Sequence, residues 1–122
     1  MESVCRLLII DDDPSILSLL EMFLKNNQYD VVCVTSGLDA LKRIESDKNG
    51  FDLIITDLVM PEISGIGLIS ILKREHPEIP IIAVTGKGAE PEKLSREANA
   101  DATLKKPFVL ATLQQMITGL TR

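Results

Sequence analysis

The chain has 122 residues, of which 45% are hydrophobic and 25% charged, and its formal net charge is −5. This length fits one domain, because two domains of about 60 residues would each lie near the lower limit for an unaided core. The composition excludes a disordered chain, a coiled coil and a disulfide-rich scaffold. The acidic charge argues against direct nucleic-acid binding. We therefore expect residues 1–122 to form one small, soluble domain.

Nothing in the sequence predicts membrane insertion or export. The longest uncharged stretch, residues 107–121, is shorter than a membrane span and contains Thr and Gln. Three acids directly follow the first apolar run, which is unlike a signal peptide. Cys5 and Cys33 have no metal or redox spacing and are expected to be buried, unpaired thiols in a reducing cytoplasm. The single histidine, His76, precedes Pro77 and is expected at a solvated helix end.

Five short apolar runs, rich in β-branched residues, are predicted to be strands. In chain order they are residues 6–10, 31–35, 51–56, 79–84 and 102–104. The runs are continuous rather than alternating, which is typical of parallel strands buried on both faces. Amphipathic stretches separate them, so the alternation predicts an α/β fold with right-handed crossovers and helices on both faces of the sheet.

The predicted helices begin with recognisable capping residues. Asp13 before Pro14 indicates an N-cap with proline at the first helical position. One face of this first helix is apolar, with Ile16, Leu17, Leu20, Phe23 and Leu24. Ser36, three residues before Asp39, resembles a capping box for the second helix. Two prolines, Pro91 and Pro107, suit the first turns of the fourth and fifth helices.

Four predicted strands end in polar residues, and the carboxyl ends of parallel strands meet at one edge of a sheet. These residues are Asp11, Asp12 and Asp13 after the first strand, Asp57 after the third, Thr85 after the fourth and Lys106 after the fifth. Taken singly, the acidic run reads as a helix cap and Asp57 as a turn residue. Their arrival at the same edge favours a functional site instead.

Such a cluster needs a cation, because like charges about 4 Å apart repel by roughly 4 kcal/mol at an effective dielectric near 20. Carboxylate and carbonyl oxygens suit Mg²⁺. A carboxylate beside Mg²⁺ can attack phosphorus and form an aspartyl phosphate. The transferred group then needs a lysine and a hydroxyl near its oxygens, and Lys106 and Thr85 are of those types.

Four segments resemble the receiver domain of bacterial two-component response regulators, and the resemblance covers essentially the whole chain. They are LLIIDDDPSILSLL, FDLIITDLVMPEISG, PIIAVTG and EANADATLKKPF. The resemblance implies a flavodoxin-like (βα)5 fold, a doubly wound five-stranded parallel sheet with strand order 2-1-3-4-5. It also implies that Asp57 is the phosphoacceptor. Asp11 and Asp12 would then hold Mg²⁺, with Asp57 and the backbone carbonyl of Val59 as further ligands.

The same resemblance gives Thr85 the role of the switch hydroxyl and Lys106 that of the lysine that pairs with the phosphoryl group. Lys106 is chosen over Lys105 because the family lysine immediately precedes the proline, and the Lys106–Pro107 bond is expected to be cis. Asp13 is left as a helix cap.

Three features depart from the family pattern. Thr103 stands where an aromatic switch residue is usual, and the segment from Thr85 to Lys106 is about one residue shorter than usual. Val59 and Lys87 stand at positions that vary among family members and tune the lifetime of the phosphoryl group.

The expected function is a phosphorylation-dependent switch, with at most slow self-dephosphorylation, rather than a turnover enzyme. A sensor histidine kinase or a histidine phosphotransfer protein would phosphorylate Asp57. The face made by helix 4, strand 5 and helix 5 would then bind a downstream protein, a fused effector domain or a second copy.

Two other classes remain as alternatives. An aspartyl-phosphate hydrolase needs a second carboxylate two residues after the nucleophile, where this chain has Val59. A flavin-binding electron carrier shares the strand order but needs a phosphate-cradling loop after strand 1, and here that loop is triply acidic.

Overall fold

The computed structural model describes residues 4–60, 63–86 and 99–121. Its strands are β1 (Arg6–Ile10), β2 (Asp30–Val34), β3 (Leu53–Asp57), β4 (Ile81–Thr85) and β5 (Ala102–Lys105). Its helices are α1 (Pro14–Asn26), α2 (Gly37–Ser46), α3 (Gly65–Glu75) and α5 (Leu110–Leu120). The fourth helix expected at Pro91 lies outside the described residues.

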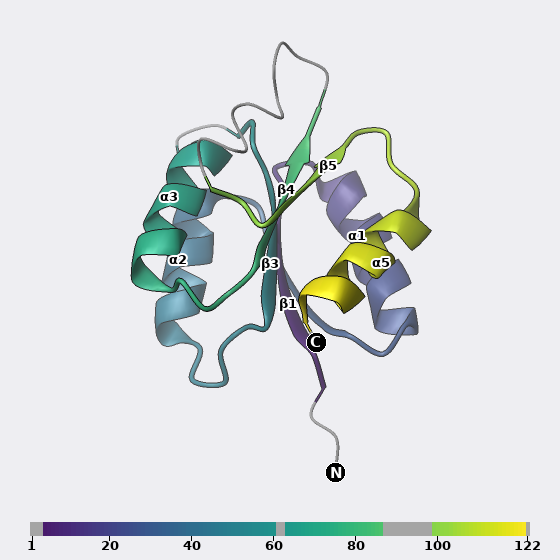
Figure 1. The fold of residues 1–122 in the computed structure, drawn as a ribbon, viewed down its shortest axis with the longest axis horizontal. Helices are drawn as coiled ribbons and strands as arrows, with labels where there is room; N and C mark the ends of the chain where they lie inside the picture. Colours follow the sequence, from purple (N-terminus) through teal and green to yellow (C-terminus); the bar gives the residue numbers. More distant parts are fainter. Residues whose placement is uncertain (1–3, 61–62, 87–98, 122) are drawn as a thin grey trace.

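The five strands form one parallel sheet in the order β2-β1-β3-β4-β5. This order confirms the predicted doubly wound, flavodoxin-like fold. Helices α2 and α3 cover one face of the sheet, and α1 and α5 cover the other (Figure 1). The strands therefore separate two hydrophobic cores.

Alternate residues of each central strand enter opposite cores. In β1, Leu8 and Ile10 pack on the side of α2 and α3, whereas Leu7 and Ile9 pack on the side of α1 and α5. Each fully buried side chain of this size contributes about 1.5–3 kcal/mol relative to exposure. This double burial explains why the strand sequences are continuously apolar.

Helix α1 begins as predicted. The Asp13 side chain accepts a hydrogen bond of 2.9 Å from the Ser15 N–H, and Pro14 is the first helical residue. The predicted apolar face is the buried face, because Leu17, Leu20 and Leu24 are buried in the core. The cap of α2 is also as predicted, with Ser36 Oγ accepting from the Asp39 N–H at 3.1 Å.

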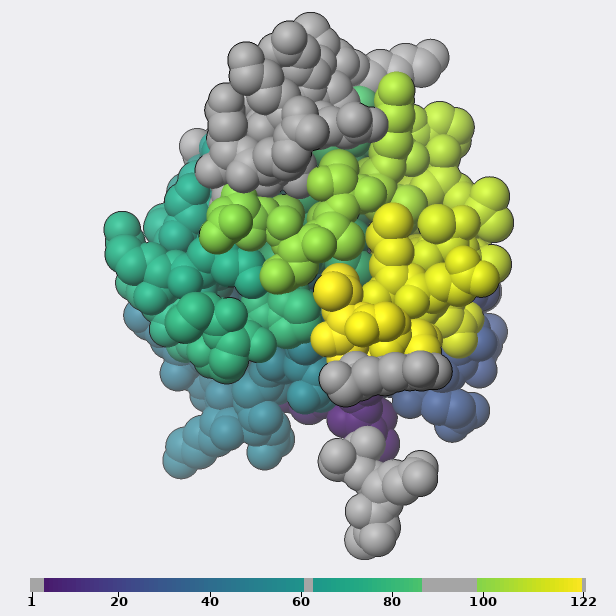
Figure 2. Space-filling model, in the orientation of Figure 1, coloured from purple at the N-terminus to yellow at the C-terminus, as the bar shows by residue number. Residues whose placement is uncertain are grey.

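The start predicted for the fifth helix is wrong by three residues. Helix α5 begins at Leu110, because the carbonyl of Val109 accepts the first helical hydrogen bonds, from the N–H groups of Thr112 and Leu113. Pro107 lies in the preceding loop, where the partly buried Phe108 packs against the core. Together β5 and α5 (green to yellow) form much of the front surface in Figure 2.

The remaining single-residue predictions are met in part. Cys5 and Cys33 are free thiols, but both are half-buried rather than fully buried. His76 follows the last residue of α3 and donates its backbone N–H to Leu72. Among the described residues, none of the helices is long and apolar enough to cross a membrane.

Candidate functional site

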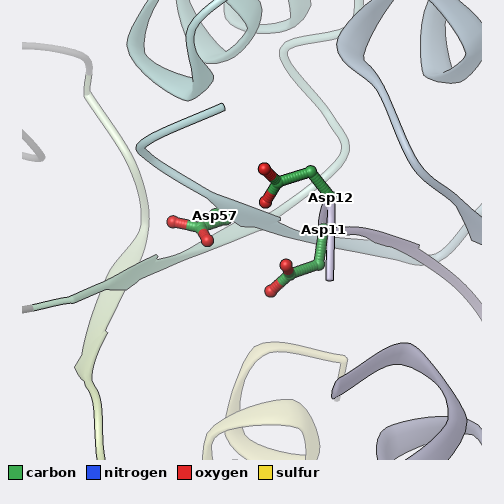
Figure 3. A group of neighbouring side chains, drawn as sticks. All are labelled: Asp11, Asp12 and Asp57. Atoms are coloured by element: carbon green, nitrogen blue, oxygen red, sulfur yellow. The ribbon is translucent and has the colours of Figure 1, made fainter. Parts of the chain in front are cut away.

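Three aspartates meet where β1 and β3 end. Asp11 and Asp12 directly follow β1, and Asp57 is the last residue of β3. One carboxylate oxygen from each lies within 4.8 Å of the others (Figure 3). Asp11 and Asp57 are buried, with 4% and 7% of their surface exposed, whereas Asp12 is exposed. The structure therefore brings together the three carboxylates that the sequence predicted at this edge.

Backbone N–H groups orient the two buried carboxylates. Asp11 Oδ1 accepts from the N–H of Asp13 at 2.9 Å, and Asp57 Oδ1 accepts from the N–H of Val59 at 3.1 Å. Because each bond joins residues two apart, the local turn fixes the direction of the carboxylate. Asp13 itself caps α1, as the sequence analysis expected.

Lys106 reaches the same cluster from the end of β5. Its Nζ lies 3.0 Å from Asp57 Oδ2 and 3.3 Å from Asp11 Oδ2. The backbone N–H of Lys106 donates to the carbonyl of Thr85 at 2.7 Å, which continues the contact between β4 and β5. The peptide bond between Lys106 and Pro107 is cis, as expected. The side chain of Lys105 is exposed.

Burial and charge act against each other in this cluster. Burial raises the pKa of Asp11, although the Asp13 N–H and the Lys106 ammonium oppose the change. Burial lowers the pKa of Lys106, but the adjacent carboxylates of Asp57 and Asp11 outweigh it, so the pKa is raised overall. Lys106 therefore stays protonated at neutral pH.

The donor set fits a small divalent cation. One ammonium faces three carboxylates, so negative charge is left over when all three are ionised. Carboxylate oxygens are hard ligands of the kind that Mg²⁺ prefers. The N–H of Val59 bonds to Asp57, so the backbone at Val59 lies beside the cluster. The Val59 side chain is 76% exposed.

Thr85 is the last residue of β4, the strand that pairs with β3 in the sheet. It is only 1% exposed, and its Oγ1 is buried without a hydrogen-bond partner among the described residues. An unsatisfied buried hydroxyl costs about 1–3 kcal/mol. Val84, its predecessor, pairs with Asp57 across β3 and β4. Thr85 and Asp57 are thus the last residues of two neighbouring strands.

Two further positions singled out in the sequence are Thr103 and Lys87. Thr103 is partly buried in β5, where it pairs with Ala83 of β4. Lys87 lies outside the described residues. Sequence reasoning missed Gly65, the first residue of α3, which lies against the backbone of Asp57. A small residue at the start of an apolar helix was the available signal, but only the packing shows why it matters.

Comparisons with known proteins agree with this geometry. The profile of the family described as "Response regulator receiver domain" matches residues 7–118. The chain is 36% identical over 118 residues to the alkaline phosphatase synthesis transcriptional regulatory protein PhoP of Bacillus subtilis, covering 96% of this chain and 48% of that protein. It is 32% identical over 116 residues to the response regulator SaeR of Staphylococcus aureus, covering 94% and 50%.

Solved structures show the same fold. The response regulator TrrA of Thermotoga maritima, solved in complex with Mg(2+)-BeF, matches with a TM-score of 0.86 at 31% identity, covering 96% of this chain and 99% of that chain. A receiver domain protein from Clostridium thermocellum matches with a TM-score of 0.89 at 27% identity, covering 97% and 94%. The chain spans about half the length of the curated relatives it matches. This chain belongs to the response regulator receiver domain family.

Proposed function

We propose that residues 1–122 act as one receiver domain in which Asp57 accepts a phosphoryl group in a Mg²⁺-dependent reaction. The contact of Lys106 Nζ with both Asp57 (3.0 Å) and Asp11 (3.3 Å) carries this proposal. It joins a carboxylate nucleophile, a cation for the phosphoryl oxygens and a metal-type ligand in one cluster. The donor would be a phosphohistidine of a sensor histidine kinase or of a histidine phosphotransfer protein.

In the proposed transfer, a carboxylate oxygen of Asp57 forms a bond to phosphorus. The phosphorus–nitrogen bond breaks, and its electron pair leaves with the imidazole nitrogen. The Val59 N–H, already bonded to Asp57 Oδ1, keeps the carboxylate oriented. Lys106 Nζ neutralises a phosphoryl oxygen, and the hydroxyl of Thr85, which has no hydrogen-bond partner in the described part of the chain, donates to another.

The carboxylates of Asp11, Asp12 and Asp57 and the carbonyl of Val59 would hold Mg²⁺. The ion supplies positive charge for the phosphoryl oxygens. One oxygen of each of the three carboxylates lies within 4.8 Å of the others, which supports a shared ion.

The test is phosphorylation by acetyl phosphate with Mg²⁺. Asp57→Asn keeps the shape of the side chain but removes the nucleophilic oxygen, so the gain of one phosphoryl group in the protein mass should disappear. Asp13→Asn is the matched control, because asparagine also caps helices, and it should be labelled like the parent. Equal labelling of Asp57→Asn and the parent would refute the assignment of Asp57.

Phosphorylation would act through Thr85 and the surface of β5 and α5. With Thr103 in place of an aromatic residue, switching would rely on Thr85, its loop and helix displacement.

On α5, the exposed Thr112 and Gln115 belong to an uncharged face, and a shallow hollow of about 540 Å³ is lined by Ala111, Gln114, Gln115, Thr118 and Gly119. A downstream protein, a fused effector domain or a second copy would bind there. Thr112→Glu with Gln115→Glu should weaken that association; unchanged light scattering and partner pull-down would contradict it.

The phosphorylated form should be long-lived, with slow self-dephosphorylation. Hydrolysis needs a water molecule in line with phosphorus, and the methyl groups of Val59 neither orient nor polarise water. Lys87 is cationic and cannot act as a general base at neutral pH. Each added positioning hydrogen bond changes the barrier by roughly 1 kcal/mol. Val59→Asn with Lys87→Glu should therefore lose its phosphoryl group severalfold faster once the donor is removed; equal or slower decay would contradict this account.

The family match supports neither alternative function. At the hydrolase acid/base position the chain has Val59, and the loop after β1 is acidic where a flavin phosphate would bind. Absence of turnover of phosphate monoesters and a colourless purified protein are the expected observations.

A further inference from the structure

Gly65 begins α3 and lies directly against the backbone of the proposed phosphoacceptor. A Cβ atom at this position would lie 2.0 Å from the carbonyl oxygen of Asp57 and 2.6 Å from Cα of Leu58. Real Cβ atoms essentially never come within 3.0 Å of such atoms. The start of α3 and the end of β3 would thus have to separate by at least 1.0 Å, the difference between 3.0 and 2.0 Å, before any side chain fitted.

Hydrogen bonds tie this contact to the acidic site. The N–H of Gly65 donates to the carbonyl of Leu58 at 3.1 Å and so closes the loop between β3 and α3. At the start of that loop, the N–H of Val59 bonds to Asp57 Oδ1 at 3.1 Å. The helix start therefore bears on both the Asp57 carboxylate and the Val59 backbone.

A side chain added at Gly65 should displace the end of β3 rather than helix α3. Helix α3 is fixed by the fully buried side chains of Leu68, Ile69 and Leu72. The last residue pair between β1 and β3 joins Ile10 to Thr56, so the strand beyond it pairs with β4 alone. Close-packed interiors do not absorb such a displacement. An added methyl group is therefore expected to shift the backbone that carries the site.

We propose that Gly65 is a positioning residue for the phosphoacceptor site. Its lack of a side chain lets α3 close onto Asp57 and Leu58, and this contact sets where the Asp57 carboxylate and the Val59 carbonyl lie relative to the acidic pair. The inference rests on the proposed function of the site. It differs from a packing role in its expected consequence, because Gly65→Ala should alter Mg²⁺ affinity beyond its effect on stability.

The test is Mg²⁺ titration followed by amide chemical shifts, at a temperature where every variant is folded. Gly65→Ala should raise the dissociation constant about tenfold, the lower end of the effect of altering groups that orient metal ligands. Gly67→Ala is the matched control in the same helix, because its Cβ would meet Ser64 Oγ at an ordinary 3.4 Å. Leu72→Ala controls for stability, since it opens a cavity at the other end of α3. Both controls should keep the parental constant.

A second variant loosens the helix start without adding bulk. Ser64 Oγ accepts from the Gly67 N–H at 3.1 Å and caps α3. Ser64→Ala removes this bond on an exposed side chain, so it should fold and should weaken Mg²⁺ binding severalfold. It decides the question if Gly65→Ala does not fold.

The outcomes separate this inference from the proposed function. A parent protein that binds Mg²⁺ while Gly65→Ala and Ser64→Ala bind it equally well would overturn the positioning role alone. A loss in Leu72→Ala as large as that in Gly65→Ala would also overturn it, because the effect would then be one of stability. A parent that binds no Mg²⁺ would overturn the proposed function together with the inference.

Discussion

Lys106 Nζ lies 3.0 Å from Oδ2 of Asp57, and the same ammonium is 3.3 Å from Oδ2 of Asp11. One cation, directly after β5, thus bridges carboxylates at the ends of β1 and β3. Among the residues that the structure describes, Lys106 is the positively charged group in contact with the acidic cluster. It offsets one of the three carboxylate charges. The behaviour of the site toward Mg²⁺ should follow from this imbalance.

Lys106→Gln should respond more strongly to Mg²⁺ than the parent does. Without the ammonium, the carboxylates repel one another and no cation competes for them, so the variant should melt lower without Mg²⁺. Added Mg²⁺ should then raise its melting temperature more than it raises that of the parent, with tighter binding by about 1–4 kcal/mol, the range for one unit-charge contact near 4 Å between bulk water and an effective dielectric near 20. Thermal unfolding with and without the ion measures this, and a smaller Mg²⁺ response in the variant would contradict the charge balance described here.

Mg²⁺ should raise the melting temperature of Asp12→Ala less than it raises that of the parent. Mg²⁺ should stabilise the parent by mass action, by about 1.4 kcal/mol when the free ion is tenfold above its dissociation constant. Removal of the exposed Asp12 carboxylate should abolish most of that shift while leaving the buried core intact. Asp39→Asn, an exposed acid in the first turn of α2, serves as the control. If Asp12→Ala bound Mg²⁺ as tightly as the parent, Asp12 would not be a ligand.

At the amino end of β1, the ion pair between Arg6 and Asp47 predicts that the stability of the protein depends on pH. Arg6 donates to both carboxylate oxygens of Asp47, at 2.8 and 3.0 Å, and these bonds lower the pKa of Asp47 from 3.8 to about 2. Since the folded pKa is the lower one, the unfolded chain takes up the proton first as pH falls. The contribution of the Arg6–Asp47 ion pair to the free energy of unfolding is therefore complete above about pH 4 and is lost on acidification toward pH 2.

Urea unfolding between pH 6 and pH 2 measures this contribution. Asp47→Asn should be less stable than the parent at pH 6, and the two should converge as pH approaches 2. Glu45→Gln, an exposed acid on α2, should show no such convergence. Parallel pH profiles for Asp47→Asn and the parent would show that the ion pair does not contribute in this way.

Cys33 should be an unreactive thiol. Burial, followed by the adjacent Glu21 carboxylate, raises the pKa of Cys33 to about 12. The thiolate is the reactive form, and its fraction falls tenfold for each unit of pKa, so alkylation at pH 8 should be slower than in the unfolded chain by about two to three orders of magnitude. Iodoacetamide labelling of Cys5→Ser isolates Cys33. Equal rates in the native and urea-unfolded protein would rule out this protection.

The sequence was sufficient to predict the sheet order and the meeting of the acidic residues. Continuous apolar runs mark strands buried on two faces, and strand ends in a parallel sheet share an edge, so Asp11, Asp57 and Lys106 were predictable neighbours. The bridging of both carboxylates by Lys106 was not predictable, because it depends on side-chain reach across three strands.

Other features depend on packing that the local sequence does not record. Pro107 has the sequence signature of a helix start, yet Phe108 packs against the core before the helix begins at Leu110. Gly65 has an importance that only its contact with the Asp57 backbone reveals. The pairing of Arg6 with Asp47 joins residues 41 apart, and no local pattern specifies it.

The most direct test of the central claim is to locate the phosphoryl group. The protein would be phosphorylated by acetyl phosphate with Mg²⁺ and treated with borohydride, which reduces an aspartyl phosphate to homoserine, and its peptides would be sequenced by mass spectrometry. We expect homoserine at Asp57 and unmodified aspartate at Asp11, Asp12 and Asp13. Modification at one of those three residues, with Asp57 intact, would contradict the account.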